Sequence, residues 1–370
     1  MKIGVPKEIK NHEYRVGLAP GLVSLLVQAG HLVIVQSHAG NKIGFTDAMY
    51  EHAGAKIVAT AAQVYHEAEM VVKVKEPQAS EFPLLRRGQI LFCYLHLAPD
   101  PDQLKHLIER QVVGIAFETV TDKEGRLPLL TPMSEVAGRL AIQAGATALQ
   151  MAYGGKGLLL GGVPGVSPAK VVVLGGGVVG TQVARMAMGF GADVTIVEKR
   201  LSRLRELDEH YGPFLKTIYS TPVSVEEAVV SADLVVGAVL IPGKKAPKLV
   251  TEDMIRRMTP GSVFVDVAID QGGCSETSRP TTHSDPTYIV HNVVHYCVAN
   301  MPGACARTST QALNNAIAPY VLELADKGYQ RAMQEDAGLK NGLNVCLGQV
   351  TNEGVAFDCG YEYYEPDRLF

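Results

Sequence analysis

Cysteine is scarce in this sequence, which has six cysteines among 370 residues. No two of them form a Cys-x-x-Cys pair, so the spacing excludes the usual structural zinc site and predicts no bound metal. We expect buried free thiols, which are typical of proteins kept in a reducing cytosol. The six are Cys93, Cys274, Cys297, Cys305, Cys346 and Cys359.

Long blocks of one charge are also absent. The chain has 34 basic and 38 acidic residues and a formal net charge of -4. Because nucleic-acid affinity rests on clustered lysine and arginine, this balance argues against a nucleic-acid partner. A local basic pocket for a small anion remains compatible with it.

Apolar runs are short, and none approaches the ~20 residues that span a bilayer. The N-terminal segment, Met1 to Glu8, becomes charged early and has no apolar core of signal-peptide length. We therefore expect a soluble, cytoplasmic protein with no membrane partner.

The sequence is long, and it is rich in aliphatic residues and glycine. Its 370 residues exceed an average domain of about 150 residues, which predicts two or three domains. Hydrophobic residues make up 47% and charged residues 19%, as in a well-packed globular protein. Several of the 37 glycines are clustered, which indicates tight turns near a ligand as well as loops.

Strand-like and helix-like segments alternate over the first 130 residues, which predicts βαβ units and a mainly parallel sheet. Runs rich in Val, Ile and Phe predict strands at 2–5, 32–35, 70–74, 89–92 and 112–116. Helix-like stretches lie at 21–28, 47–51 and 101–110.

A second alternating region begins at Lys170. One long helix at 132–153 and a Gly/Pro-rich loop at 154–168 precede it. Strands are predicted at 170–174, 193–197, 233–237, 262–266 and 288–291, and helices at 178–188, 201–209, 225–230 and 251–258.

An amphipathic helix at about 309–333 follows, with little partner sheet of its own, so we expect the C-terminal part to pack on the first domain. The predicted fold is therefore α/β, with two Rossmann-like domains and mainly parallel sheets. One domain, 1–130 and 307–370, is discontinuous. The other domain, 131–306, is inserted in it.

The motif Gly-x-Gly-x-x-Gly occurs at residues 175–180, with glycines at Gly175, Gly177 and Gly180. It follows the apolar run 171–174 and opens a predicted helix, and Glu198 ends the next strand. The glycines permit a tight turn, close approach of a pyrophosphate and close helix packing, and the helix N-terminus attracts phosphate. The alternative is a glycine turn in a sheet domain without a cofactor.

Glu198 can accept hydrogen bonds from both ribose hydroxyls, and its charge repels a 2′-phosphate, which favours NAD over NADP. Lys199, Arg200 and Arg203 lie close in sequence and weaken that preference. The strand at 233–237 ends in small residues, which places open backbone at the sheet edge where ligands bind. We therefore expect 131–306 to be an NAD-binding domain and the discontinuous domain, 1–130 and 307–370, to be the substrate domain.

Polar residues follow several predicted strands. Asp270 comes just after the strand 262–266, in a glycine turn, and is either catalytic or a turn former. His96 follows the strand 89–92 and suits general acid/base work, although a satisfied core or strand-end histidine is the alternative.

Two basic segments are candidates for binding a carboxylate. Lys73 and Lys75 occupy alternate positions of one predicted strand and hence one face, either for a substrate or as a solvated edge. Arg15 lies on a loop after the first strand, where a guanidinium can bind a carboxylate through two hydrogen bonds, or is a surface arginine.

These segments together resemble the alanine dehydrogenase and pyridine nucleotide transhydrogenase family. The resemblance covers nearly the whole chain and favours its alanine dehydrogenase members. It is carried by residues 1–8, 15–18, 73–77, 94–98, 131–139, 161–165, 266–273, 300–303 and 307–310.

The resemblance implies two domains around a cleft, a homohexamer, and reversible NAD-dependent oxidative deamination of L-alanine to pyruvate and ammonia. It implies that Arg15 and Lys75 bind the substrate, that His96 is the general acid/base, and that Asp270 is the second catalytic residue. The residues implied to line NAD, besides the glycine turn and Asp270, are Ser134, Val178, Val179, Glu198, Arg203, Ser220, Val239, Leu240, Val267, Arg279, Val298 and Met301.

Two departures from the family pattern occur. Glu198 stands where Asp is frequent, and Cys305-Ala306 stands where Val-Pro is common.

Three alternative functions remain open at this point. They are the NAD-binding part of a proton-translocating transhydrogenase, dehydrogenation of another amino acid, as in the lysine-forming saccharopine dehydrogenases, and a non-catalytic NAD-binding sensor.

Overall fold

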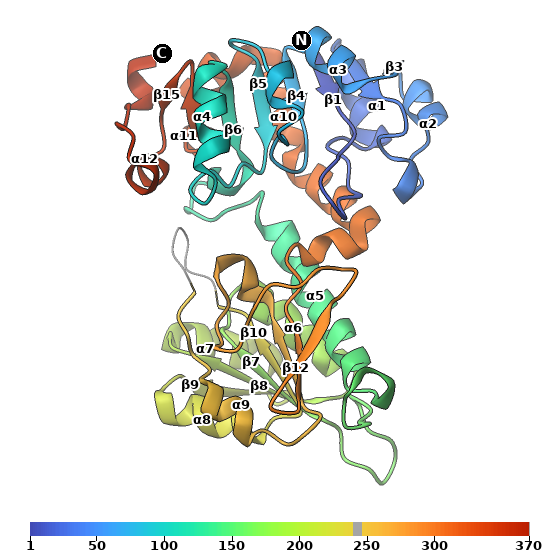
Figure 1. The fold of residues 1–370 in the computed structure, drawn as a ribbon, viewed down its shortest axis with the longest axis vertical. Coiled ribbons are helices and arrows are strands. Elements are labelled where there is room, and N and C mark those ends of the chain that lie inside the picture. Colours follow the sequence, from blue (N-terminus) through green and yellow to red (C-terminus); the bar gives the residue numbers. More distant parts are fainter. Residues whose placement is uncertain (240–245, 370) are drawn as a thin grey trace. The chain divides into compact units, whose positions relative to one another are not determined.

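The structure is a computed structural model that describes residues 1–239 and 246–369 (Figure 1). The chain divides into two units, Met1–Met133 with Ala306–Phe370 and Ser134–Cys305. Each unit is α/β with a mainly parallel sheet, and the first is discontinuous in sequence, so the predicted fold class is confirmed.

The first unit contains an eight-stranded sheet in the order β15-β14-β6-β5-β4-β1-β2-β3. Strands β1 to β6 are parallel, and the chain order reverses between β4 and β1, which makes a topological switch point. Antiparallel β14 pairs with β6 and with β15. The bounds are β1 (Lys2–Val5), β2 (Leu32–Gln36), β3 (Lys56–Val58), β4 (Met70–Val72), β5 (Ile90–Cys93), β6 (Val113–Ala116), β14 (Leu343–Cys346) and β15 (Gln349–Val350).

Local signals explain where the helices of the first unit begin. Thr60 and Gln63 form a capping box at α3, and Asp100 caps α4 ahead of Pro101. The bounds are α1 (Pro20–Gln28), α2 (Asp47–His52), α3 (Ala61–Glu67), α4 (Pro101–Glu109), α10 (Ala306–Glu335, with non-helical Gly328), α11 (Ala337–Lys340) and α12 (Glu353–Cys359).

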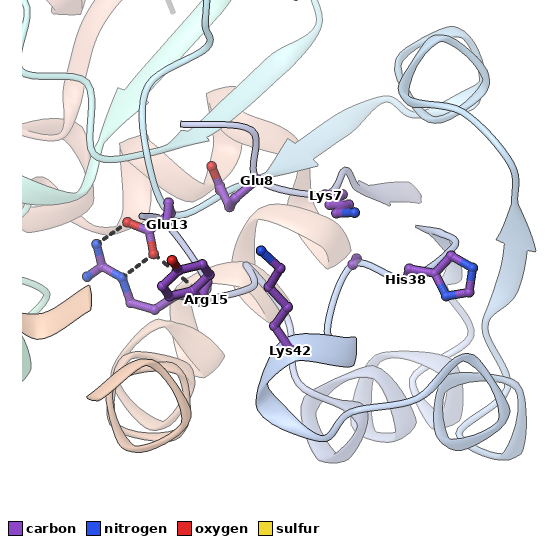
Figure 2. A pocket seen from close by; sticks show the side chains of 8 residues that line it. Lys7, Glu8, Glu13, Arg15, His38 and Lys42 are labelled. Atoms are coloured by element: carbon purple, nitrogen blue, oxygen red, sulfur yellow. Dashed lines mark hydrogen bonds and ion pairs between the residues drawn. The ribbon is translucent and has the colours of Figure 1, made fainter. Parts of the chain in front are cut away.

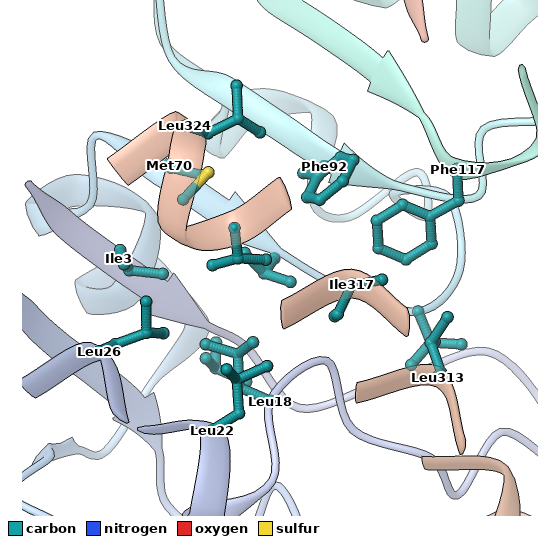
Figure 3. Packing of buried hydrophobic residues seen from close by; sticks show 14 of the residues in the cluster. Ile3, Leu18, Leu22, Leu26, Met70, Phe92, Phe117, Leu313, Ile317 and Leu324 are labelled. Carbon is teal, nitrogen blue, oxygen red and sulfur yellow. The ribbon is translucent and has the colours of Figure 1, made fainter. Parts of the chain in front are cut away.

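Helix α10 supplies much of the core of the first unit. Its buried side chains Leu313, Ile317 and Leu324 belong to one cluster with Ile3 of β1 and Phe92 of β5 (Figure 3). This packing against the sheet explains why the C-terminal segment belongs to the first unit, because an apolar helix stripe must be buried against another element.

The second unit contains a seven-stranded sheet in the order β12-β13-β11-β10-β7-β8-β9, in which only the pair β12–β13 is antiparallel. Its switch point lies between β7 and β10. The strands are β7 (Lys170–Leu174), β8 (Asp193–Glu198), β9 (Leu215–Tyr219), β10 (Leu234–Gly237), β11 (Val263–Asp266), β12 (Thr287–Val290) and β13 (Val293–Tyr296). The helices are α5 (Thr131–Ala148), α6 (Val178–Gly189), α7 (Leu201–Tyr211), α8 (Pro222–Ser231) and α9 (Glu252–Arg257).

The structure corrects several predicted elements. The helix predicted at 132–153 ends at Ala148, and a short 3-10 turn covers Met151–Tyr153. Strands β3, β9, β13, β14 and β15 and helices α3, α11 and α12 were not predicted, because most are short and several of the strands lie at sheet edges, where burial does not impose an alternating pattern.

Several features are absent from the part of the chain that the structure describes. No helix there is long and apolar enough to cross a membrane. No group of three or more His, Cys, Asp or Glu side chains is placed to hold a metal ion. All six cysteines are free, and the expectation that they are buried is wrong for Cys305 and Cys359, which are partly exposed.

Replacing Leu313 by Ala tests the role of α10 in the first core. We expect Leu313→Ala to lower the free energy of unfolding by about 3 kcal/mol, because the side chain is 0% exposed and leaves a cavity. Chemical denaturation measures the change. The control is Leu25→Ala, at a side chain that is 43% exposed, for which we expect less than about 1 kcal/mol. Equal losses in the two variants would contradict the packing.

Candidate functional site

In the first unit, the candidate residues leave the carboxyl ends of neighbouring parallel strands. Arg15 follows β1, Lys75 follows β4 and His96 follows β5. The segments after β1 and β4 flank the switch point, where open α/β sheets bind ligands. The fold therefore brings the three predicted residues to one edge of one sheet.

Arg15 is held by Glu13. The Glu13 carboxylate accepts hydrogen bonds from Arg15 N, Nε and Nη2 at 3.1, 2.7 and 2.6 Å (Figure 2). Arg15 Nη1 also donates to Sδ of Met133 at 3.1 Å. The alternative of a surface arginine is wrong, since Arg15 is 2% exposed.

The Arg15–Glu13 pair keeps its charges. Burial opposes ionisation of Glu13, but the hydrogen bonds and charge of Arg15, with a smaller effect of Lys75, lower the Glu13 pKa to about 2. The guanidinium is thus oriented by a carboxylate that stays ionised at neutral pH.

Lys73 and Lys75 do not share one face of a strand, which corrects the prediction. Strand β4 ends at Val72 and is central in the sheet, so the alternative of a solvated edge is wrong as well. Lys73 is 0% exposed, and its Nζ donates to both oxygens of Glu81 at 2.9 and 2.7 Å. Lys75 is only partly buried and contributes to the lowered pKa of Glu13, so it is the lysine that faces the Arg15 pair.

His96 is exposed and lies beyond the end of β5, so it is not a core histidine, whereas the alternative of a strand-end histidine is not contradicted. Its backbone has the left-handed φ of 48°. Glu118 accepts hydrogen bonds from the backbone N–H groups of Leu95 at 3.2 Å and of His96 at 2.6 Å. The imidazole is nearly parallel to the ring of Tyr94, with centroids 5.9 Å apart, and Nδ1 lies 3.9 Å from Glu118 Oε1.

Glu8 lies beyond the end of β1 and is 7% exposed. Its Oε1 accepts hydrogen bonds from the backbone N–H groups of Val74 at 2.7 Å and Lys75 at 3.3 Å. Burial raises the Glu8 pKa to about 7, even though the charge of Lys73 lowers it. With Arg15 it lines a small cavity of about 40 Å³, whose other lining residues are Lys7, Glu13, Tyr14, His38, Ala39 and Lys42 (Figure 2).

In the second unit, the residues expected to line NAD also follow the carboxyl ends of parallel strands. The glycine turn follows β7, Glu198 ends β8, Ser220 follows β9, Val239 follows β10, and Val267 and Asp270 follow β11. Val298 and Met301 follow β13 and are buried in the core of the unit. Ser134 lies in the first turn of α5, and Leu240 lies outside the described residues.

The glycine turn has the geometry of a phosphate site. Gly177 begins α6 without a side-chain cap, and no described atom lies within 4 Å of the position that a Cβ there would take. Space and unpaired N–H groups at a helix N-terminus fit a pyrophosphate. At Gly180, by contrast, a Cβ would lie 1.8 Å from the carbonyl oxygen of Gly175, so only glycine permits this packing.

Glu198 is fixed against this turn. Its Oε2 accepts a hydrogen bond from Gly176 N at 2.9 Å, and its Oε1 accepts one from Arg200 N at 3.0 Å. Burial opposes ionisation, but these bonds and the Arg200 side chain lower the Glu198 pKa, so it is ionised at neutral pH. Arg203 donates to the carbonyl oxygen of Gly176 at 2.7 Å and closes the other side of the turn.

Asp270 is exposed in the 3-10 turn Val267–Gln271. Buried Asp266 holds this turn, since its carboxylate accepts hydrogen bonds from Ala268 N at 3.0 Å and Cys274 N at 2.9 Å. The exposed Arg279 guanidinium lies over the ring of Tyr288, 4.2 Å from its centroid.

The structure adds residues that the sequence did not single out. Glu8, Glu13 and Glu118 hold the candidate residues of the first unit, and Tyr94 stacks on His96. Glu13 could have been suspected from the sequence, because an acidic residue two positions before Arg15 is close enough to pair with it. Glu8 and Glu118 have none, because their partners lie 66 and 22 residues away in sequence.

The sheet orders and the glycine turn place the chain in the class of two-unit Rossmann-like α/β proteins. Family models described as "Alanine dehydrogenase/PNT, N-terminal domain" and "Alanine dehydrogenase/PNT, C-terminal domain" match residues 4–137 and 141–353. The chain therefore belongs to the alanine dehydrogenase/PNT family, and the resemblance seen in the sequence is confirmed.

Individual relatives agree. The chain is 58% identical to an alanine dehydrogenase of Halomonas elongata over 369 residues, with 100% of each chain covered. It is 56% identical to an alanine dehydrogenase of Bacillus subtilis, with 100% of this chain and 97% of the other covered.

Two solved structures are also similar. An L-alanine dehydrogenase structure superposes with a TM-score of 0.94 at 50% identity, over 97% of this chain and 99% of that one. A transhydrogenase from Sinorhizobium meliloti, at 24% identity, has a TM-score of 0.83 over 95% of this chain and 100% of that one. The latter likeness shows the fold alone.

The raised pKa of Glu8 predicts a pH-dependent stability. Between the ordinary pKa of 4.5 and about 7, the folded chain keeps the Glu8 proton and the unfolded chain has lost it, so stability falls as pH rises. We expect Glu8→Gln to gain about 3 kcal/mol relative to the parent between pH 4.5 and pH 8, and nothing further above that. Denaturation across this range measures it, with Glu362→Gln at an exposed position as the control. A constant difference between parent and Glu8→Gln would contradict the shift.

The glycine turn is tested by Gly180→Ala. The new Cβ collides with Gly175, so we expect a loss of about 3 kcal/mol in stability and at least about tenfold weaker NADH binding. Fluorescence titration with NADH measures the binding. Gly189→Ala in the same helix is the control and keeps the parent affinity, because a Cβ at Gly189 would meet no described atom within 4 Å other than its chain neighbours and the backbone of its own helix. An unchanged NADH affinity in Gly180→Ala would refute the assignment.

Proposed function

We propose that this chain is an NAD-dependent L-alanine dehydrogenase that interconverts L-alanine with pyruvate and ammonia. The observation that carries the proposal is that Arg15, Lys75 and His96 follow the carboxyl ends of the neighbouring parallel strands β1, β4 and β5. The full-length similarity to alanine dehydrogenases supports it.

The first unit is proposed to bind the substrate. Arg15, oriented by Glu13, binds the carboxylate of alanine or pyruvate through charge-assisted hydrogen bonds. Lys75 binds the carboxylate and the keto oxygen. Holding the substrate in one orientation supplies a large part of the rate enhancement.

The second unit is proposed to bind NAD. Its pyrophosphate fits the uncapped start of α6 at Gly177, and its ribose hydroxyls fit Glu198. The other residues predicted to line NAD are proposed to complete this site. NAD, when bound, accepts the hydride that leaves Cα of alanine.

His96 is proposed as the general acid/base. It is exposed, it is held by Glu118, and histidine exchanges protons near neutral pH. It moves protons while water adds to the iminium carbon and ammonia leaves, and Asp270 is proposed as the second catalytic residue.

Simple observations distinguish the proposed function from the alternative functions. A transhydrogenase part would exchange hydride between nucleotides without an amino acid, and the similarity to a transhydrogenase reaches only 24% identity. A sensor would bind NADH without any alanine-dependent reaction. A saccharopine-type dehydrogenase would prefer lysine-derived substrates.

The assembly and the compartment belong to the proposal as well. We propose a homohexamer in the cytoplasm, as the family resemblance implies. The absence of a membrane-crossing helix among the described residues is compatible with this location.

One assay tests the activity. We expect NADH to form, measured by absorbance, with alanine, but not with lysine or without an amino acid, and more slowly with glycine or serine. His96→Ala lowers the rate at least about 100-fold, because a general acid/base contributes that much, while NADH still binds. His66→Ala, at an exposed histidine of α3, is the control and keeps the parent rate. Normal turnover by His96→Ala would reject its role.

A further inference from the structure

We propose that Glu8 is a positioning residue for substrate binding, which fixes the backbone that carries Lys75. The inference rests on the proposed function and deepens it. Glu8 acts through the main chain of Val74 and Lys75.

The topology brings Glu8 to this place. Strands β1 and β4 are parallel neighbours, with Ile3 opposite Met70 and Gly4 opposite Val71. The two chains leave the sheet at the same edge, so the segment after β1 runs beside the segment after β4. Glu8 therefore meets a backbone that lies 66 residues further along the chain.

Beyond β4, Lys73 N still donates to the carbonyl oxygen of Phe92 in β5, at 3.2 Å. The next two backbone N–H groups donate to Glu8 instead of a strand carbonyl, and a buried N–H without an acceptor would be destabilising. One oxygen of Glu8 accepts two consecutive N–H groups, at 2.7 and 3.3 Å. Two bonds to one rigid group restrict the local backbone, so the direction in which the Lys75 side chain leaves the main chain is fixed.

The buried Lys73 strengthens this arrangement. Its Nζ lies 3.6 Å from Oε2 of Glu8 and donates to Glu81, which also accepts a hydrogen bond from Gln78 N at 2.9 Å. The segment from Lys73 to Gln78 is thus held at its beginning and at its end. The other oxygen of Glu8, Oε2, makes no hydrogen bond within the described part of the chain. Oε1 alone therefore satisfies the two backbone N–H groups.

The arrangement around His96 is similar. Glu118 accepts the consecutive N–H groups of Leu95 and His96 after β5, as Glu8 accepts those of Val74 and Lys75 after β4. In both cases a carboxylate from a neighbouring parallel strand connection holds the residue proposed to act on the substrate.

Three substitutions of Glu8 test the inference in steady-state kinetics of pyruvate amination. Glu8→Ala removes the acceptor, and we expect kcat/KM for pyruvate to fall about 30-fold, while KM for NADH changes less than about twofold. Glu8→Asp withdraws the carboxylate by one methylene, and a loss in the same direction is expected. Glu8→Gln keeps an oxygen that accepts both N–H groups, so at pH 6.5 it retains the parent KM for pyruvate.

The matched control is Asp336→Ala. The Asp336 carboxylate also accepts two consecutive N–H groups, those of Gly338 at 2.8 Å and Leu339 at 3.1 Å, but at the start of α11. We expect this variant to lose stability and to keep KM for pyruvate within about twofold. A merely structural role of Glu8 would make the two alanine variants alike.

The outcomes separate this inference from the proposed function. A parent chain without alanine-dependent NADH formation overturns the proposed function. An active parent whose Glu8→Ala and Glu8→Asp variants keep the parent KM for pyruvate overturns the role of Glu8 alone. The role is also overturned if Glu8→Gln loses as much pyruvate affinity as Glu8→Ala. If Glu8→Ala does not fold, the comparison of Glu8→Asp with Glu8→Gln decides.

Discussion

Carboxylates accept the backbone N–H groups at the carboxyl edges of both sheets, and the candidate site depends on this interaction. Where a parallel strand ends, the chain leaves its hydrogen-bonding neighbours, and its buried N–H groups need other acceptors. Glu8, Glu118, Glu198 and Asp266 provide them, and each holds a loop or turn with a residue of proposed function. The loops therefore have defined conformations although they lie outside regular structure.

Both units have the same kind of candidate binding place, at the carboxyl edge of a parallel sheet. Each sheet reverses its strand order once, between β4 and β1 and between β7 and β10, and the connections diverge there. In the first unit the polar side chains Arg15 and Lys75 follow the strands beside this point. In the second unit the glycine turn follows β7, so the equivalent place has open backbone and fits phosphate.

Charge in the first unit is balanced within short distances. Arg15 is paired with Glu13, whose pKa is lowered to about 2, and Lys73 is paired with Glu81. Burial without a close hydrogen-bonded cation instead raises the Glu8 pKa to about 7. Arg15, Lys75 and the exposed His96 are the basic groups at this edge that we propose to act on the substrate.

The sequence by itself determined the alternation of strands and helices, the glycine turn and the places of Arg15, His96 and Asp270 after strands. Local patterns suffice there, because hydrophobic periodicity and glycine spacing act over a few residues. Only the tertiary structure decided that Lys73 is buried and Lys75 is not, that β4 ends at Val72, and that Glu8 and Glu118 hold the loops. Those outcomes depend on partners brought together by parallel pairing of strands distant in sequence, for which a local pattern contains no signal.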